Sequence, residues 1–451
     1  MRALLRSHSR FFLLATLAAL ALRLLFFFCF PRVTTDSLVY GDIAKNWLTQ
    51  GVYGLTESGQ AVPTFIRLPG YPAFLAVVFA LFGLDHYGAA LLWQILADLG
   101  TCLVIADLAR RTVSARSAKA AFLLAALCPF LANYTAAALT ETLEVFFVAL
   151  ALDFAVAGLD KLESGNLRPW AGCGLSLAAC ILLRPDGGLL LAALGIYLGY
   201  LLRRRPHLRK PILRAGVIVS VVALAPLLPW TWRNLHTLHQ FQPLAPRYAN
   251  GPEDFVPRGY IRWAKTWMAD YVSVEEIYWP VPGSAIDADN LPSRAFDDED
   301  QEERTLALLA TYNQGLAITP EMDAQFAVLA DQRIHAAPLR YYLWLPALRV
   351  AGMWLRPRTE LLPSNTRWWE FDDDPLGLTL AITFGVMNLV YIGAAGLGLI
   401  RGHPIRYAGL LLLSLLLRSL FLGTLENPES RYTLECYPVV VLLASSLLAR
   451  L

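Results

Sequence analysis

Several charged side chains stand just outside long apolar runs of the sequence, where they could handle a phosphate and a proton. Asp36 follows the first apolar run, Arg67 precedes the next, and Arg184 and Asp186 lie between two others. A positioned carboxylate can accept the proton of an attacking hydroxyl. A guanidinium binds phosphate through two parallel hydrogen bonds. These residue types are able to accept a proton and to bind a phosphate.

The candidate site draws on six connections between apolar runs. The candidate catalytic residue is Asp36. The predicted substrate-binding residues are Tyr40, Arg67, Tyr71, Glu141, Arg184, Asp186, Arg233, Arg431 and Tyr432. Ionisable groups at membrane depth are costly and are functional candidates by default.

Metal ligands are not predicted. The acidic runs Asp297–Asp300 and Asp372–Asp374 contain the Asp-x-Asp pattern that can hold a metal and a nucleotide, but charge runs in loops are usually solvated. His236 and His239 have helical spacing and no third ligand. We therefore expect no essential metal or other cofactor.

Each candidate also has a structural alternative. Asp36 could be the N-cap of a helix, and Arg67 could anchor at lipid headgroups. Arg184 and Asp186 could form a local ion pair that holds their turn. Arg233 follows Trp230 and Trp232 and could simply extend its long side chain to the membrane interface.

The apolar runs determine the fold class. The 451 residues are 56% hydrophobic and 16% charged, with a mean hydropathy of +0.46. Soluble domains are about 45–50% apolar with roughly 25% charge. The runs approach the length of about 20 residues that spans a bilayer, and they predict an all-α polytopic membrane protein of about 10–13 transmembrane helices. Juxtamembrane helices and a partly helical periplasmic region complete the prediction. No nucleic-acid signature is present, so no nucleic-acid partner is expected.

Basic clusters predict the orientation, because positive charge near helix ends marks the cytoplasmic side. The clusters are Arg2 to Arg10, Arg110 to Lys119, Arg203 to Lys210, Arg401 to Arg406, and Arg450. Placing them inside puts every candidate site residue outside. The run Pro69–Leu84 then fits a juxtamembrane or re-entrant helix. A further short span near Tyr341–Leu355 is interrupted by Arg349.

Three regions are predicted. Residues 1–230 form an N-terminal transmembrane module, whose first outer loop, residues 31–86, carries the catalytic residue. Residues 231–375 form an extracytoplasmic soluble or juxtamembrane region, and residues 376–451 form C-terminal transmembrane helices. In the first outer loop, Val39, Ile43 and Trp47 have the spacing of an amphipathic helix. In the second region, Thr319-Pro320-Glu321 predicts a helix start.

Taken in order, the motifs resemble those of GT-C glycosyltransferases that use polyprenyl-phosphate sugars. The similarity is to the bacterial group related to protein O-mannosyltransferases and to the lipid A aminoarabinose transferase. The matching pieces are Asp36-x-x-x-Tyr40, Gly51-Val52-Tyr53-Gly54, Arg67-x-Pro69-Gly70-Tyr71-Pro72, Thr140-Glu141-Thr142-Leu143, Leu183-Arg184-Pro185-Asp186, Pro229-Trp230-x-x-Arg233-Asn234 and Arg431-Tyr432. Several relatives carry two consecutive acids where this chain has Asp36-Ser37.

The resemblance implies an integral-membrane glycosyltransferase, either a hexosyl- or a pentosyltransferase, with Asp36 as base and inversion at the anomeric carbon. The donor would be a polyprenyl-phosphate sugar, and the acceptor a glycan, lipid or protein. The expected location is the bacterial inner membrane, with the site facing the periplasm or cell exterior.

Two other classes of protein stay open from the sequence. A flippase or transporter of lipid-linked glycans would line a path through the bilayer with charges. The charges within predicted spans are Arg23, Asp98, Asp107, Asp153 and Arg418. A noncatalytic scaffold of an envelope assembly is the third class, and loss of function on Asp36→Ala with normal folding would argue against it.

Overall fold

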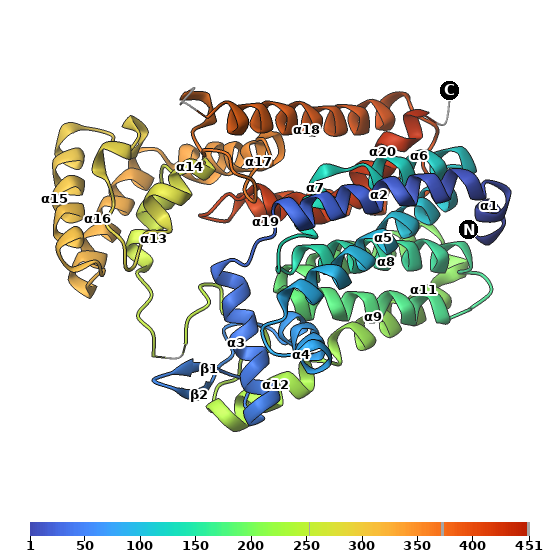
Figure 1. Cartoon of the computed structure of the whole chain (residues 1–451), viewed down its shortest axis with the longest axis horizontal. Coiled ribbons are helices and arrows are strands. Elements are labelled where there is room, and N and C mark those ends of the chain that lie inside the picture. The colour runs from blue at the N-terminus through green and yellow to red at the C-terminus, as the bar shows by residue number, and fades with distance from the viewer. Residues whose placement is uncertain (252, 371–373, 449–451) are drawn as a thin grey trace. The chain divides into compact units, whose positions relative to one another are not determined.

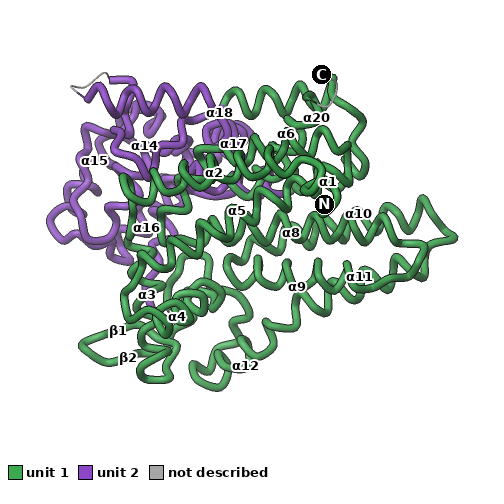
Figure 2. Tube along the Cα trace, turned by 45° about the vertical axis from the view of Figure 1, so that its right-hand side comes forward, with its two compact units in different colours: residues 1–253, 389–417, 434–451 green, residues 254–388, 418–433 purple. Residues whose placement is uncertain are grey.

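The computed structural model of this chain describes residues 1–251, 253–370 and 374–448, and it is almost entirely helical (Figure 1). The chain divides into two compact units (Figure 2). Unit 1 comprises residues 1–253, 389–417 and 434–451, and unit 2 comprises residues 254–388 and 418–433.

Unit 1 is a bundle of long helices with one small hairpin. Its elements are α1 (Arg2–Ser7), α2 (Ser9–Cys29), α3 (Thr35–Gln50), β1 (Gly54–Glu57), β2 (Gln60–Pro63), α4 (Gly70–Phe82), α5 (Tyr87–Thr112), α6 (Ala115–Ala126), α7 (Pro129–Tyr134), α8 (Glu141–Asp160), α9 (Arg168–Leu183), η1 (Pro185–Gly187), α10 (Gly188–Arg204), η2 (Pro206–Leu208), α11 (Arg209–Leu224), α12 (Leu227–Leu238) and α20 (Tyr437–Leu448). The strands β1 and β2 pair antiparallel, with Gly54 opposite Pro63.

Unit 2 contains shorter helices. They are α13 (Arg258–Lys265), α14 (Tyr271–Ser273), η3 (Val274–Tyr278), η4 (Ala288–Asn290), η5 (Ser293–Ala295), α15 (Glu299–Gly315), α16 (Pro320–Ala336), η6 (Arg340–Trp344), α17 (Leu345–Leu355) and η7 (Trp368–Glu370). Three elements belong to both units, namely α18 (Pro375–Arg401), α19 (Ala408–Gly423) and η8 (Ser430–Cys436). Helix α16 begins as predicted, because the Thr319 side chain accepts a hydrogen bond from the Met322 amide and Pro320 follows at the first helical position.

The prediction of a polytopic all-helical membrane protein is confirmed. Within the described residues, six helices are long and apolar enough to cross a membrane: α2, α5, α8, the run Pro185–Arg204, the run Pro206–Leu238, and α18. Three shorter helices, α4, α9 and α19, are also apolar. The 13 residues of α4 match the predicted juxtamembrane run.

Several predicted basic clusters meet at one end of unit 1. The amino group of Met1 lies 3.5 Å from Asp107, and Arg406 pairs with Asp160 at 2.6 Å. The Arg406 amide also donates to the Thr112 carbonyl, at 2.8 Å. The far end of α2 instead meets the connection between α7 and α8, where the Arg32 amide donates to the Ala136 carbonyl. Segments from several basic connections therefore meet at one end of the bundle, and the end of α2 that precedes Asp36 meets the connection between α7 and α8. Arg450 lies outside the described residues.

Charged side chains inside the helices of unit 1 have partners. Arg23 and Asp98 form a pair at 2.6 Å. Asp107 pairs with Arg110 and Arg111, and Asp153 pairs with Arg111 at 3.0 Å. In unit 2, Arg418 donates to the Tyr432 carbonyl at 3.0 Å. The pairs of Arg23 with Asp98 and of Asp153 with Arg111 thus connect α2 to α5 and α8 to α5.

Candidate active site

Helix α3 sets the position of Asp36. Its N-cap is Thr34, whose side chain accepts from the Ser37 amide while the Ser37 hydroxyl accepts from the Thr34 amide. This reciprocal arrangement is a capping box. The alternative that Asp36 caps the helix is therefore wrong, because Thr34 is the N-cap and Asp36 lies in the first turn. The apolar face of α3 packs inward through Ile43, which is fully buried.

Asp36 faces Arg67 across the loop. Arg67 Nη2 donates to Asp36 Oδ1 at 2.8 Å, with side-chain exposures of 23% and 35% respectively. The same guanidinium lies 5.6 Å from the centre of the Tyr40 ring, a distance at which cation–π attraction operates. Burial raises the pKa of Tyr40 to about 12, although the charge of Arg67 opposes this. Asp36, Tyr40 and Arg67 thus form one half-buried group with a neutral phenol beside a carboxylate–guanidinium pair.

The turn that carries Arg67 is held in place by Tyr53 and by close packing of Gly70 against Leu182. The Tyr53 hydroxyl donates to the Arg67 carbonyl at 2.9 Å. At Gly70 a Cβ atom would lie 2.5 Å from the Leu182 carbonyl oxygen, so only glycine permits this close approach. The contact brings the Arg67 turn against the end of α9, two residues before Arg184. Two motifs that lie far apart in the sequence are joined here.

Arg184 lies among four carboxylates. It is 3.3 Å from Glu141, 3.4 Å from Glu144 and 3.3 Å from Asp186. Burial works against its charge, but Asp186, Glu144, Glu435 and Glu141 outweigh burial and raise the pKa of Arg184 well above its usual value. The predicted ion pair with Asp186 exists and is one part of a larger cluster. The sequence prediction did not include Glu144 or Glu435.

The two groups are electrostatic neighbours. The charges of Arg184 and Glu141 both influence the Tyr40 phenol. The Tyr40 ring lies 5.1 Å from the Tyr71 ring, and the Tyr71 hydroxyl donates to Gln94 Oε1 at 2.7 Å. Gln94 in turn donates to the Ala137 carbonyl at 2.7 Å. The structure brings seven of the ten predicted residues together at this end of unit 1: Asp36, Tyr40, Arg67, Tyr71, Glu141, Arg184 and Asp186.

Arg233 makes mainly backbone contacts. Its guanidinium donates to the Tyr53 and Thr64 carbonyls, both at 2.6 Å, and lies over the rings of Tyr53 and Trp230. These contacts fasten α12 to both ends of the β1–β2 hairpin. Substrate binding by Arg233 stays a prediction.

Arg431 and Tyr432 belong to unit 2. Arg431 Nε lies 2.6 Å from Glu429 Oε2, and its guanidinium is 5.4 Å from the Tyr432 ring centre. The Tyr432 hydroxyl donates to Glu429. Buried Arg358 holds the same segment by donating to the Ser430 carbonyl at 2.7 Å and to the Thr433 hydroxyl.

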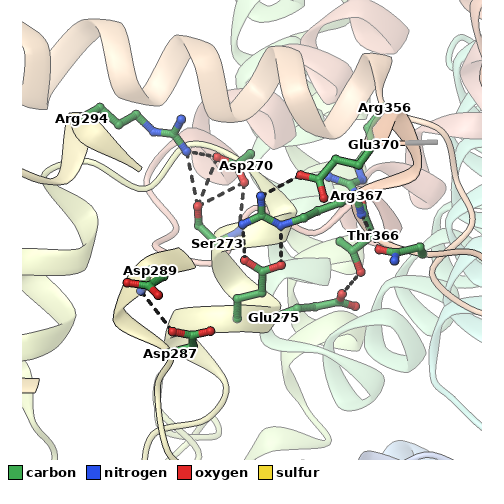
Figure 3. A network of polar contacts seen from close by, with 12 residues as sticks. Asp270, Ser273, Glu275, Asp287, Asp289, Arg294, Arg356, Thr366, Arg367 and Glu370 are labelled. Atoms are coloured by element: carbon green, nitrogen blue, oxygen red, sulfur yellow. Dashed lines mark hydrogen bonds and ion pairs between the residues drawn. The ribbon is translucent and has the colours of Figure 1, made fainter. Parts of the chain in front are cut away.

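Unit 2 also contains a polar network that the sequence did not predict (Figure 3). Arg367 donates two hydrogen bonds to the Glu276 carboxylate, at 2.8 and 2.7 Å. The Thr366 hydroxyl donates to Glu275, and Arg356 Nη2 donates to the Thr366 carbonyl at 2.9 Å. The network fixes the loop after α17 on the segment that contains η3.

Side chains of the two acidic runs pair with arginines of unit 2 or accept hydrogen bonds from amides at the starts of helices. Asp297 pairs with Arg340 at 2.7 Å and with Arg333 at 3.1 Å, and the Asp298 side chain caps α15. Asp374 accepts from the Gly377 amide at the start of α18, whereas Asp372 and Asp373 lie outside the described residues. Across the ranges that the structure describes, no group of three or more His, Cys, Asp or Glu side chains could hold a metal ion.

Part of the chain is similar to a known protein family, and the fold is similar to those of solved structures. Residues 63–230 match the model of the dolichyl-phosphate-mannose-protein mannosyltransferase family. No curated protein matches the chain. Among solved structures, the archaeal oligosaccharyltransferase AglB from Archaeoglobus fulgidus, in complex with an inhibitory peptide and a dolichol-phosphate, is 12% identical with a TM-score of 0.51. The match covers 99% of this chain and 50% of AglB, so this chain spans half the length of that protein.

A second solved structure is ArnT from Cupriavidus metallidurans bound to undecaprenyl phosphate. It is 17% identical with a TM-score of 0.45, and the match covers 97% of this chain and 77% of ArnT. The resemblance predicted from the motifs is confirmed by the family match, which contains Arg67, Tyr71, Glu141, Arg184 and Asp186. Residues 63–230 thus resemble this mannosyltransferase family, and the chain has a fold similar to that of AglB.

Proposed function

We propose that this GT-C membrane protein transfers a sugar from a polyprenyl-phosphate donor to a hydroxyl of an extracytoplasmic acceptor, with inversion at the anomeric carbon. The observation that carries the proposal is the half-buried group of Asp36, Arg67 and Tyr40, adjoining the Arg184 cluster. AglB was solved with a dolichol-phosphate, and the matching family is described by a dolichyl-phosphate sugar, which supports this class of donor. The sugar is a hexose or a pentose.

The chemistry needs one base and one cation. The acceptor oxygen attacks the anomeric carbon and its proton passes to Asp36. The bond from that carbon to the phosphate oxygen breaks, and the electron pair leaves on the polyprenyl phosphate. Because the leaving phosphate gains negative charge, a guanidinium beside it stabilises the transition state. A single base on the face opposite the leaving group gives inversion.

Arg67 is our candidate for that guanidinium. In the structure it bonds Asp36 at 2.8 Å, and this pair would weaken the carboxylate as a base. A donor phosphate would compete for the fork of Arg67, because guanidinium–phosphate pairs are strong and bidentate. Donor binding would then release Asp36 to accept a proton. Tyr40, held neutral by burial, can donate a hydrogen bond to the phosphate or the sugar.

Arg184 has a different proposed role. Four carboxylates surround it, so its charge is already balanced and it is less available to a phosphate than Arg67. We propose that Arg184 positions Glu141 and Asp186, which orient the acceptor. Tyr71 would support the ring of Tyr40 through their edge-to-face contact. Arg431 and Tyr432 stay proposed substrate-binding residues of unit 2, as does Arg233 of unit 1.

The proposed location is the bacterial inner membrane with the site facing the periplasm. The support is the gathering of basic connections in unit 1, where the amino terminus lies near Asp107 and Arg406 pairs with Asp160, because positive charge favours the cytoplasmic side. The proposed acceptor is a glycan, a lipid or a protein, and no essential metal is proposed.

The test is sugar transfer by purified protein in lipid, supplied with a set of polyprenyl-phosphate sugars. Asp36→Asn is compared with wild type and with Asp85→Asn. Asp85 is a matched control, because it also pairs with a cation, Lys45 at 3.2 Å, and is exposed. We expect a loss of about 10²–10⁴-fold for Asp36→Asn, the usual size of a general-base contribution, and near wild-type rates for Asp85→Asn. Retained transfer by Asp36→Asn would remove Asp36 as the base.

A further inference from the structure

The segment formed by η6 and α17 exposes an apolar face. Its large exposed apolar residues are Tyr342, Leu343, Trp344, Leu348 and Leu355, and Leu339 directly precedes it; each is between 50% and 69% exposed. The opposite face is buried through Leu345 and Met353. By contrast, polar side chains alternate with small or apolar ones among the exposed positions of α16, where Glu321, Gln325, Gln332 and His335 are exposed. The exposed surface of α16 therefore suits water better than the exposed face of η6 and α17 does.

The charge that interrupts this segment points into the protein. Arg349 is fully buried, and its Nε donates to the Met268 carbonyl at 2.9 Å. Its Nη2 donates to the Lys265 carbonyl. The remaining arginines, Arg340 and Arg356, lie at or beyond the ends of the segment. The exposed face of α17 thus carries no charge, although the sequence suggested that Arg349 would break it.

The apolar face continues onto an apolar helix. In unit 2, Trp354 Nε1 donates to the Ser419 hydroxyl of α19 at 3.2 Å. A Cβ atom at Gly423 would lie 3.3 Å from both the Pro346 carbonyl oxygen and a Val350 methyl. Leu420, on the same helix, is 60% exposed. Because α19 is one of the apolar helices of this membrane protein, its exposed surface and that of α17 form one continuous apolar surface.

We propose that η6 and α17 are embedded in the bilayer, with this face in contact with lipid acyl chains. At 1.5 Å per residue the segment is about 24 Å long, slightly less than the hydrocarbon core of roughly 30 Å. Tyr341, Tyr342 and Trp344 stand at its start, where aromatic residues favour the membrane interface. Unit 2 therefore divides into a water-facing part, α13 to α16, and a lipid-facing part. This inference does not depend on the proposed reaction.

The first test uses the unmodified protein in liposomes with a carbene-generating probe dissolved in the bilayer. Peptide mapping should find label on Leu339–Leu355 and on α18, which serves as the positive reference, while α16 stays unlabelled. Label on α18 with none on Leu339–Leu355 would overturn the proposal. Equal labelling of α16 would also overturn it, because exposure alone would then explain the result.

The second test measures collisions of single spin labels with oxygen, which concentrates in lipid, and with a polar nickel complex, which stays in water. Labels are placed by Leu343→Cys and Leu348→Cys in a Cys29→Ser background, since Cys29 is the exposed native cysteine. Val328→Cys on α16 is the matched control, with an exposed aliphatic side chain in the same unit. Oxygen collisions should dominate at 343 and 348, and nickel collisions at 328. Nickel access at 343 and 348, or protection from both reagents, would overturn the proposal, the latter in favour of a protein partner.

Discussion

Two Asp–Arg pairs in unit 1 have similar distances and different surroundings. Arg23 and Asp98 lie 2.6 Å apart with exposures of 0% and 2%. Arg67 and Asp36 lie 2.8 Å apart with exposures of 23% and 35%. Arg23 also donates to the Ala19, Ala125 and Ala126 carbonyls, so it joins α2, α5 and α6. The first pair is closed, whereas the second is open to solvent.

The difference in exposure distinguishes a pair that stabilises the fold from a pair that can react with a substrate. A buried pair with all its hydrogen bonds made cannot exchange partners without unfolding its surroundings. A partly exposed pair contributes little to stability, typically about 0–1 kcal/mol, and can exchange one partner for a ligand. Asp98 and Arg23 therefore hold the bundle together, and Asp36 and Arg67 are able to act on a substrate.

The largest expected effect comes from breaking the closed pair. Asp98→Ala leaves the Arg23 charge buried without its counter-ion, which costs about 3–5 kcal/mol. We expect a strongly lowered unfolding temperature in detergent, measured by the loss of the monodisperse peak in size-exclusion chromatography. Asp36→Ala should change that temperature very little. Similar losses for the two variants would contradict the distinction between the pairs.

A double variant checks the cause of that loss. Arg23→Met with Asp98→Leu replaces both charges by apolar groups, which is often neutral for a buried pair. The double variant should regain most of the stability that Asp98→Ala loses. If it stays as unstable as Asp98→Ala, packing rather than charge explains the effect.

A smaller effect is expected when the open pair loses its cation. Arg67→Met removes a charged hydrogen-bond donor worth about 1.5–3 kcal/mol, or roughly 10–100-fold in donor affinity. Arg67→Lys should retain part of that affinity, because an ammonium still offers a point charge without the fork. The measurement is the KM for the polyprenyl-phosphate sugar at fixed acceptor. An unchanged KM in Arg67→Met would assign the donor phosphate to another cation.

Arg233 is another arginine for which a structural role and a substrate-binding role can be measured separately. Arg233→Met removes donors to the Tyr53 and Thr64 carbonyls, at a cost of about 1–2 kcal/mol. We expect faster proteolysis within the β1–β2 hairpin and, if Arg233 also binds substrate as proposed, a raised KM for the donor in the folded protein. Faster proteolysis with an unchanged KM would limit Arg233 to its structural contacts with the hairpin.

The sequence predicts which residues gather, because apolar runs place their ends and basic clusters orient them. Apart from the local pair of Arg184 with Asp186, it does not predict their partners. Asp36 was expected to be either a base or a cap, and only the Thr34–Ser37 capping box decides against the cap. Glu144 follows Glu141 at i+3, a spacing that places both on one helix face, and this signal could have identified it. Partners from distant segments, as at Arg233 and Gln94, depend on tertiary packing that periodicity does not encode.

The smallest expected effect concerns Tyr40, which lies between the two extremes of burial. Its pKa is raised from 10 to about 12 by burial. Above pH 10 the unfolded chain ionises this phenol while the folded chain does not, so the contribution of Tyr40 to stability is full below pH 10. It declines as the pH rises toward 12. Each pKa unit between the folded and unfolded states corresponds to about 1.4 kcal/mol in the free energy of unfolding. By pH 11 the wild type should therefore lose about 1 kcal/mol of unfolding free energy relative to Tyr40→Phe. Unfolding midpoints of the two proteins at pH 8, 10 and 11 measure the difference. A constant difference across this range would place the phenol in water, and Tyr40 would then lose its role as a neutral donor beside Asp36.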